Sequence, residues 1–164
     1  MRPDMPPRLP SFPYVGLHRY FVTICTGGRR AVFVSDAVFG MTERRLRESA
    51  GRHGFSPHAY CFMPDHVHVL LAAAREDADL RAAVRRFKQT SAFDFTRTPG
   101  AGRLWQPGYH ERVVRSDEAS LSVTRYILEN PVRAGLTRTF QDYPFSGTAE
   151  FTKAELASLW DQRT

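Results

Sequence analysis

The sequence lacks several features that define whole classes of protein. It has no run of about 18 apolar residues, so no membrane-spanning helix is expected. The proline-rich residues 1–13 cannot form the apolar core of a signal peptide. Two cysteines, Cys25 and Cys61, lie in separate apolar runs without C-x-x-C spacing, which predicts buried free thiols. These absences predict a soluble, cytoplasmic protein.

The sequence also has no Walker pattern and no glycine-rich dinucleotide loop, so a bound nucleotide is not expected. Its 164 residues suffice for one domain with its own core. We expect a single unit over 1–164, with 1–16 an extended basic arm and 148–164 a tail. The 23 Lys and Arg exceed the 17 Asp and Glu, a net charge of +6, which favours an anionic partner such as nucleic acid.

The most informative stretch is 59–71, AYCFMPDHVHVLL. It reads as two strands joined by the turn pair Pro64-Asp65. Side chains alternate along a strand, so His66 and His68 share one face while the valines between and after them face a core. Two imidazoles side by side on a strand are a ready pair of metal ligands. The alternative is ordinary polar alternation on a half-exposed strand.

The remaining patterns predict a strand at 20–26, a helix at 36–52, a helix opening at Asp79, a strand at 110–115 and a helix from Ser116. Pro131 disfavours helical geometry in the residue before it, so this last helix is expected to end near Asn130. The order β-α-β-β-α-β-α predicts an α+β fold, a ferredoxin-like antiparallel β-sheet with helices on one face.

The helix opening at Asp79 carries a positive stripe, because Arg81, Arg85 and Lys88 recur at helical spacing with Arg86 nearby. The stripe is either a solvated face or a contact for a phosphate backbone. Trp105 and Tyr109 follow in a Pro/Gly-rich segment. Exposed, they could stack on unpaired bases; buried, they would fill the core.

Tyr126 and Asn130 stand at i and i+4 on the helix from Ser116, so they share one face. A phenol is a weak nucleophile at neutral pH, but a metal-bound phosphodiester would be electrophilic enough for it to attack. His66 and His68 could hold that metal, and Asn130 could supply an oxygen ligand. The alternative is a tyrosine in the core or at its rim.

Three ordered motifs, FMPDHVHVLL, LWQPGYHERVVR and RYILENPVRAGL, resemble the REP-associated tyrosine transposases. These are relatives of the insertion-sequence single-strand transposases in the HUH nuclease superfamily. The likeness covers nearly the whole chain. It implies the HUH nuclease fold, Mg²⁺ or Mn²⁺ held by His66 and His68, Asn130 completing the metal site, and Tyr126 as nucleophile. It also implies that the arm near Arg8 helps read a tetranucleotide beside a DNA hairpin.

The leading hypothesis is therefore a transposase, a single-stranded DNA endonuclease and strand transferase acting near hairpin DNA through a 5′-phosphotyrosine. The phosphate contacts are assigned to the positive stripe. One alternative is a non-catalytic binder of hairpin nucleic acid, and another is a metal-dependent nuclease that uses water. Insertion-sequence relatives act as dimers, whereas the REP-associated group is expected to act as monomers at the nucleoid. The tail is expected to cover the active site or to pack elsewhere.

Overall fold

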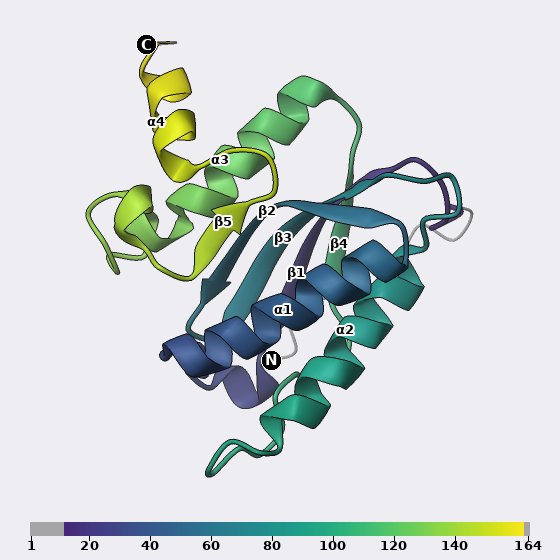
Figure 1. Ribbon diagram of the computed structural model, residues 1–164, viewed down its shortest axis with the longest axis vertical. Helices are drawn as coiled ribbons and strands as arrows, with labels where there is room; N and C mark the ends of the chain where they lie inside the picture. Colours follow the sequence, from purple (N-terminus) through teal and green to yellow (C-terminus); the bar gives the residue numbers. More distant parts are fainter. Residues whose placement is uncertain (1–11, 163–164) are drawn as a thin grey trace.

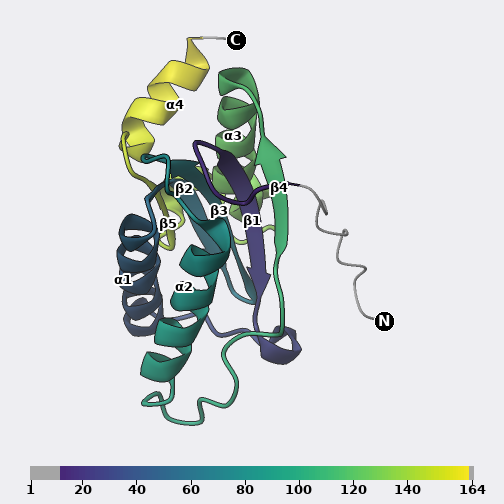
Figure 2. The same ribbon diagram turned by 90° about the vertical axis from the view of Figure 1, so that its right-hand side faces the viewer.

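The computed structural model describes residues 12–162 and contains a five-stranded antiparallel sheet in the order β4-β1-β3-β2-β5 (Figure 1). The strands are β1 (Arg19–Cys25), β2 (Phe55–Met63), β3 (His66–Ala73), β4 (His110–Val114) and β5 (Ser146–Thr148). The helices are α1 (Asp36–Arg52), α2 (Leu80–Phe95), α3 (Asp117–Arg133) and α4 (Lys153–Asp161), with short 3-10 turns η1 (Gly27–Arg29) and η2 (Phe140–Asp142). Figure 2 shows β4 and β1 at one side of the sheet.

Alternating residues of the central strands face two separate cores. On β3, Val67 and Val69 are buried with side chains of α1 and α2, whereas Leu70 is buried with Val123 and Ile127 of α3. The predicted α+β antiparallel fold is confirmed. Helices α1 and α2 lie together on one face as expected, while α3 covers the opposite face of β2 and β3. The sheet is thus buried on both sides.

The predicted helix starts are confirmed by side-chain caps. Ser35 Oγ, Asp79 Oδ1 and Ser116 Oγ each accept a hydrogen bond from the backbone amide three residues later, at 3.4, 3.1 and 3.0 Å. Each cap satisfies one of the amides that the first helical turn leaves without an intrahelical acceptor. These starts are local in origin, which is why the sequence reveals them.

The expected end of α3 near Asn130 is wrong, because the helix continues through Pro131 to Arg133. Pro131 is buried within the last turn, so its missing amide and the bulk of its ring act where only Val132 and Arg133 follow in the helix. The helix then ends in a Schellman arrangement: Leu136 N donates to Pro131 O at 2.9 Å and Gly135 N donates to Val132 O at 3.0 Å. Gly135 has φ of 72°, the left-handed conformation that this ending requires.

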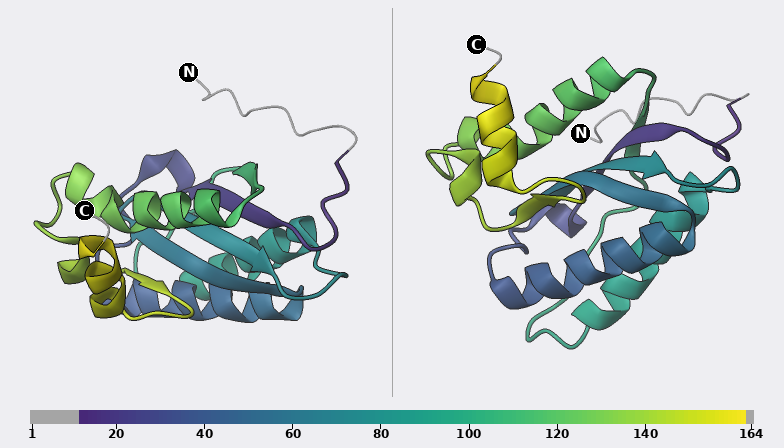
Figure 3. Two further views of the ribbon diagram at one scale, coloured as in Figure 1. Left: turned by 90° about the horizontal axis from the view of Figure 1, so that it is seen from above. Right: turned by 45° about the horizontal axis from the view of Figure 1, so that its top comes forward.

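The tail forms α4, which packs against the far side of α3 near η2 (Figure 3). Leu156 is buried with Leu128 and Phe140. Leu128 stands two residues, or about 200 degrees of helix, from Tyr126, so α4 and Tyr126 lie on opposite sides of α3. Of the two expectations for the tail, packing elsewhere is therefore the one observed.

Both cysteines are free thiols and buried, as predicted. Burial raises the pKa of Cys61 to about 12, so this thiol stays protonated and unreactive at neutral pH. None of the helices within residues 12–162 is long and apolar enough to cross a membrane.

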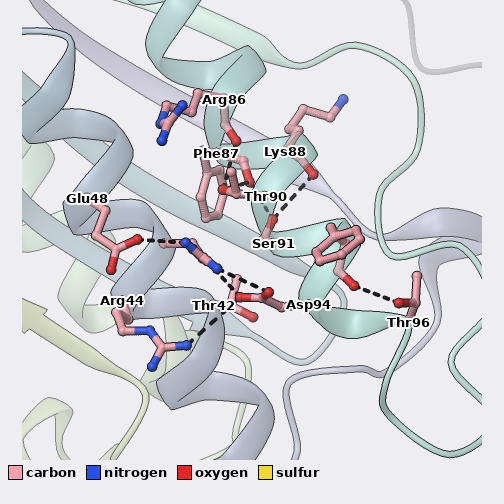
Figure 4. Close-up of polar contacts among 12 residues, drawn as sticks. Thr42, Arg44, Glu48, Arg86, Phe87, Lys88, Thr90, Ser91, Asp94 and Thr96 are labelled. Atoms are coloured by element: carbon pink, nitrogen blue, oxygen red, sulfur yellow. Dashed lines mark hydrogen bonds and ion pairs between the residues drawn. The ribbon is translucent and has the colours of Figure 1, made fainter.

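An ion pair joins α1 to α2. Arg45 Nε and Nη2 donate to the two carboxylate oxygens of Asp94 at 2.7 and 3.1 Å, and Arg44 approaches the same carboxylate at 3.9 Å. Figure 4 shows the Asp94 side chain pointing from α2 toward α1, where Arg44 and Glu48 lie. The hydrogen bond from Arg45 holds the pKa of Asp94 below its usual range. The Asp94 side chain is 10% exposed, so this pair is better shielded than most surface pairs.

Asp94→Asn is expected to lower the free energy of unfolding by about 1 kcal/mol at pH 7, because a bidentate charge-assisted pair is lost. The pKa of Asp94 is lowered by folding, so its contribution is complete above the unfolded-state value near 3.9 and disappears as pH falls through the lower folded value. Denaturant unfolding of wild type and variant at pH 7 and at about pH 2 measures the loss of stability and its dependence on pH. The exposed pair Arg75–Asp77 provides the control Asp77→Asn, for which no change is expected. An equal effect of Asp94→Asn at both pH values would contradict the account.

Candidate active site

His66 and His68 lie at the start of β3 on the face that α3 covers. Their Nε2 atoms are 3.2 Å apart, and the ring centroids are 4.6 Å apart. Strand β1 pairs with β3 so that Thr23 is opposite His68. The side-by-side placement predicted from the H-x-H spacing is what the structure contains. The two rings present a pair of nitrogen atoms to one small space.

The outer nitrogen of each ring has its own partner. His66 Nδ1 is 2.7 Å from Asp65 Oδ1, and His68 Nδ1 is 2.8 Å from Thr23 Oγ1. Burial lowers the pKa of His68 to about 3, with nearby positive charge adding to the effect, and burial also lowers the pKa of His66. Both rings are therefore neutral at physiological pH, the state in which imidazole binds a metal.

Tyr126 of α3 lies beside this pair. Its ring centroid is 6.0 Å from that of His68 and 5.8 Å from that of Phe21 on β1. On the ring's face, the Arg133 guanidinium lies 4.2 Å from the centroid, and Arg133 Nη2 donates to Tyr126 O at 2.6 Å. Tyr126 is 48% exposed although its neighbour Ile127 is fully buried. The phenol is thus held in place yet open to a large substrate.

Asn130 stands one turn beyond Tyr126 on α3 and is half-buried. Residues 12–162 contain no cluster of three or more His, Cys, Asp or Glu side chains that could hold a metal. A two-histidine site therefore requires further oxygen ligands, and an amide oxygen together with substrate phosphate and water suits a hard cation such as Mg²⁺. The donor set fits a divalent ion that binds together with its substrate.

A groove of about 1000 Å³ leads to Tyr126 between α3 and β4. Its floor includes Phe21 and Thr23, and its β4 wall carries His110 and Arg112. Arg112 is exposed and its guanidinium lies 5.6 Å from the Phe21 ring centroid, on the same face as Tyr126. The groove has an aromatic floor, and its lining carries the cations Arg112 and Arg115 beside the anions Glu111 and Glu118. Aromatic rings and cations are the groups that bind single-stranded nucleic acid.

The positive stripe lies away from this groove. Arg81, Arg85, Arg86 and Lys88 are on α2, which covers the opposite face of the sheet. Arg81 and Arg85 are exposed and line a hollow of about 370 Å³ together with Tyr109. Lys88 Nζ donates to Gln106 O and Gly108 O at 2.9 and 2.8 Å, so its ammonium already holds the segment before β4.

Trp105 is a core residue. It is 5% exposed, its ring packs against Phe33 and Phe87, and its Nε1 donates to Ser91 Oγ at 2.9 Å. The prediction that Trp105 stacks on bases is therefore wrong, because the buried ring has no face open to a base. The alternative, that Trp105 fills the core, is confirmed. Arg8 lies outside the described residues.

Several residues of the site were not predicted from the sequence, and the signal for most of them is strand alternation. Phe21 and Thr23 alternate with the buried residues of β1, and His110 and Arg112 alternate on β4. A charged residue and an aromatic residue at matched positions on neighbouring strands indicate a shared exposed face. Asp65 and Arg29 have no such signal, because loop geometry places them. Arg133 stands seven residues after Tyr126 on α3, so helical spacing puts the two on one face of the helix.

Three comparisons with known proteins bear on this site. The family model for IS200-like transposases matches residues 14–130, which include both histidines, Tyr126 and Asn130. The chain is 31% identical over 121 residues to the ISDra2 transposase TnpA of Deinococcus radiodurans, covering 70% of this chain and 84% of that protein. It is 25% identical over 133 residues to the REP-associated tyrosine transposase of Escherichia coli, covering 81% of this chain and 78% of that protein.

The fold is shared with the solved structure of a REP-associated tyrosine transposase bound to a REP hairpin. The TM-score is 0.71 at 23% sequence identity, covering 82% of this chain and 79% of the other.

Trp105→Ala is expected to lower the free energy of unfolding by about 3–5 kcal/mol, because it empties a core position and leaves Ser91 without its indole partner. Phe93→Ala is the control, since Phe93 is 64% exposed, and a change within about 0.5 kcal/mol is expected. Denaturant unfolding measures both variants. A fully stable Trp105→Ala protein that has lost nucleic-acid binding would contradict the core assignment.

Proposed function

We propose, on the premise that this chain belongs to the family of IS200-like transposases, that it cuts and rejoins single-stranded DNA through Tyr126. One observation carries the proposal: the Tyr126 ring lies 6.0 Å from His68, beside a pair of neutral imidazoles, at the end of an open groove. A nucleophile, a candidate metal site and a route for a long substrate thus meet at one point.

Transposases of this family are generally metal-dependent. We propose that His66 Nε2, His68 Nε2 and the Asn130 side-chain oxygen hold Mg²⁺ or Mn²⁺ together with a substrate phosphate oxygen. When bound, the divalent ion withdraws negative charge from the phosphate and makes its phosphorus more electrophilic. The neutral rings and the amide supply no negative charge, so metal affinity is expected to rise when DNA is present.

The chain's own residues perform the transfer. Tyr126 Oη attacks phosphorus; its bond to phosphorus forms as the bond to the 3′ oxygen breaks, the phenol proton is lost to solvent, and the 3′ oxygen takes up a proton. The product is a 5′-phosphotyrosine, which a 3′-hydroxyl can attack to reverse the step on another end. Each step exchanges one phosphodiester for another, so no nucleotide cofactor is needed. Arg133 holds the ring from one face while this happens.

We propose that the single strand lies in the groove along β4, where the exposed Arg112 and Arg115 contact its phosphates. Strand β4 is at the edge of the sheet, and Tyr109 immediately before it lines the hollow that Arg81 and Arg85 border on the other face. A hairpin could therefore contact this hollow, and Arg86 beside it on α2, while its flanking strand passes around the edge into the groove. Lys88 would act indirectly, by holding the segment before β4 through Gln106 O and Gly108 O.

The hairpin partner is proposed by analogy with the REP-associated transposases, one of which was solved with a REP hairpin. The arm containing Arg8 is proposed to read bases beside that hairpin. A monomer is the proposed working unit, because Tyr126 faces His68 of its own chain. As a DNA-processing enzyme, it is proposed to act at the nucleoid in the cytoplasm.

Tyr126→Phe should abolish formation of a covalent protein–DNA adduct, because the attacking oxygen is gone. His66→Ala should slow adduct formation by at least about 100-fold, since loss of a ligand should exceed the 10–100-fold typical of its outer partners. Labelled single-stranded hairpin DNA from the repeats flanking the gene, with Mn²⁺, Mg²⁺ or a chelator, followed by denaturing gels, measures both. Tyr60→Phe is the matched tyrosine control, because Tyr60 is buried in the core on the α1 side of the sheet, and it should keep the adduct.

If the wild type cleaves DNA without forming an adduct, and Tyr126→Phe still cleaves it, the protein is instead a nuclease that uses water. Tight hairpin binding with neither adduct nor cleavage in any metal would indicate a non-catalytic binding protein. Either result would contradict the tyrosine mechanism.

Arg112→Ala should weaken DNA binding to a similar degree for all sequences and reduce the slope of log affinity against log salt by about 1, because one phosphate contact is lost. Arg85→Ala should weaken binding and reduce the salt slope only for DNA that carries the hairpin. Binding titrations at several salt concentrations, with hairpin and unstructured strands, separate the two. Arg52→Ala at the exposed end of α1 is the control. Unchanged salt slopes for Arg112→Ala would remove this residue from the DNA path.

A further inference from the structure

We infer that Asp65, itself held by Arg29, is a positioning residue that fixes the tautomer of His66 and so directs its Nε2 lone pair toward a metal. Thr23 has a related but more permissive role for His68. The inference rests on the proposed function for the identity of what is bound. It adds residues that neither the H-x-H spacing nor the tyrosine helix indicates.

The contact between Asp65 and His66 allows one arrangement of protons. Asp65 Oδ1 is 2.7 Å from His66 Nδ1, and Asp65 Oδ2 accepts from Arg29 Nε at 3.0 Å. An ionised carboxylate only accepts hydrogen bonds, so in a neutral ring Nδ1 must carry the proton. His66 Nε2 is then bare and faces His68. A ligating histidine that donates its outer N–H to a carboxylate is the usual arrangement in metal sites.

Asp65 is held at its backbone by Thr26 and at its carboxylate by Arg29. Its backbone oxygen accepts from Thr26 N and from Thr26 Oγ1, both at 3.0 Å. Arg29 Nη1 contacts Cys25 Sγ at 2.8 Å, which anchors the guanidinium to the end of β1. Arg29 also has φ of 56°, a left-handed conformation that residues with a Cβ adopt only at a cost. The turn therefore retains an unfavourable backbone conformation that aims Arg29 at Asp65.

Thr23 differs from Asp65 because a hydroxyl can donate or accept. His66 Nε2 and His68 Nε2 are 3.2 Å apart, a hydrogen-bond distance. Since His66 Nε2 is bare, His68 Nε2 must carry the proton between them in the metal-free protein, and Thr23 then donates to His68 Nδ1. For both Nε2 atoms to be free to hold a cation, the His68 proton would have to lie on Nδ1, where Thr23 Oγ1 would accept it. The tautomer of His66 is thus fixed in advance, whereas the tautomer of His68 would change on metal binding.

The test is ¹⁵N NMR of the histidine side chains in the metal-free protein at neutral pH, combined with Mn²⁺ titration. The wild-type spectrum should show Nδ1–H alone for His66 and Nε2–H for His68. In Asp65→Ala the His66 ring should populate both tautomers, and Mn²⁺ affinity should fall 10–100-fold. Asp65→Asn should recover part of this loss, because an amide oxygen still accepts from Nδ1–H without the negative charge.

Asp77→Ala is the matched control, because it removes a carboxylate from a comparable Arg–Asp pair on the loop that follows the other end of β3. Asp65→Ala should keep its fold, since the bonds from Thr26 use the Asp65 backbone, and circular dichroism checks this. An unchanged His66 tautomer in Asp65→Ala, or an Mn²⁺ affinity within twofold of the wild type, would overturn the inference. A wild-type protein that binds no Mn²⁺ even when single-stranded hairpin DNA is present would refute the metal site of the proposed function, while the metal-free tautomers would still decide the role of Asp65.

Discussion

The site depends first on the register in which β1 pairs with β3. This register sets Thr23 opposite His68 and puts both on the face beneath α3, while Val67 and Val69 are buried on the other face. A slip of one residue would turn every side chain over, moving the valines to the face beneath α3 and burying both imidazoles among α1 and α2. The packing that stabilises the sheet therefore also fixes where the histidines lie, and a histidine pair on a strand is held more firmly than one on a loop.

Helix α3 supplies the other half of the site because it is packed onto the sheet by its own apolar side. Val123 and Ile127 are buried, and Arg19 of β1 bonds to Asp117 and Ser120 at the helix start. The buried residues set the rotation of the helix, which leaves Tyr126 directed at the histidines but half exposed. All of these contacts lie within one chain, so a single copy brings the proposed nucleophile and the proposed metal ligands together.

Local patterns predicted much of this arrangement. The caps at Ser35, Asp79 and Ser116, the β2–β3 turn and the H-x-H face all follow from residues close in sequence, so the sequence reveals them. What it does not reveal depends on distant contacts. The face that α3 would cover, the burial of Trp105 and the aim of Arg29 are decided by packing between elements far apart in the chain. The positive stripe on α2 was visible, but its separation from Tyr126 by the thickness of the sheet was not.

The central claim is that one chain uses Tyr126 as a nucleophile beside its own histidine pair. Peptide mapping by mass spectrometry of protein trapped with single-stranded hairpin DNA and Mn²⁺ tests it most directly. The account predicts a nucleotide joined through its 5′ phosphate to the peptide that contains Tyr126, and no such peptide when a chelator replaces the metal. A nucleotide on any other residue, or cleaved DNA with every peptide unmodified, would contradict it.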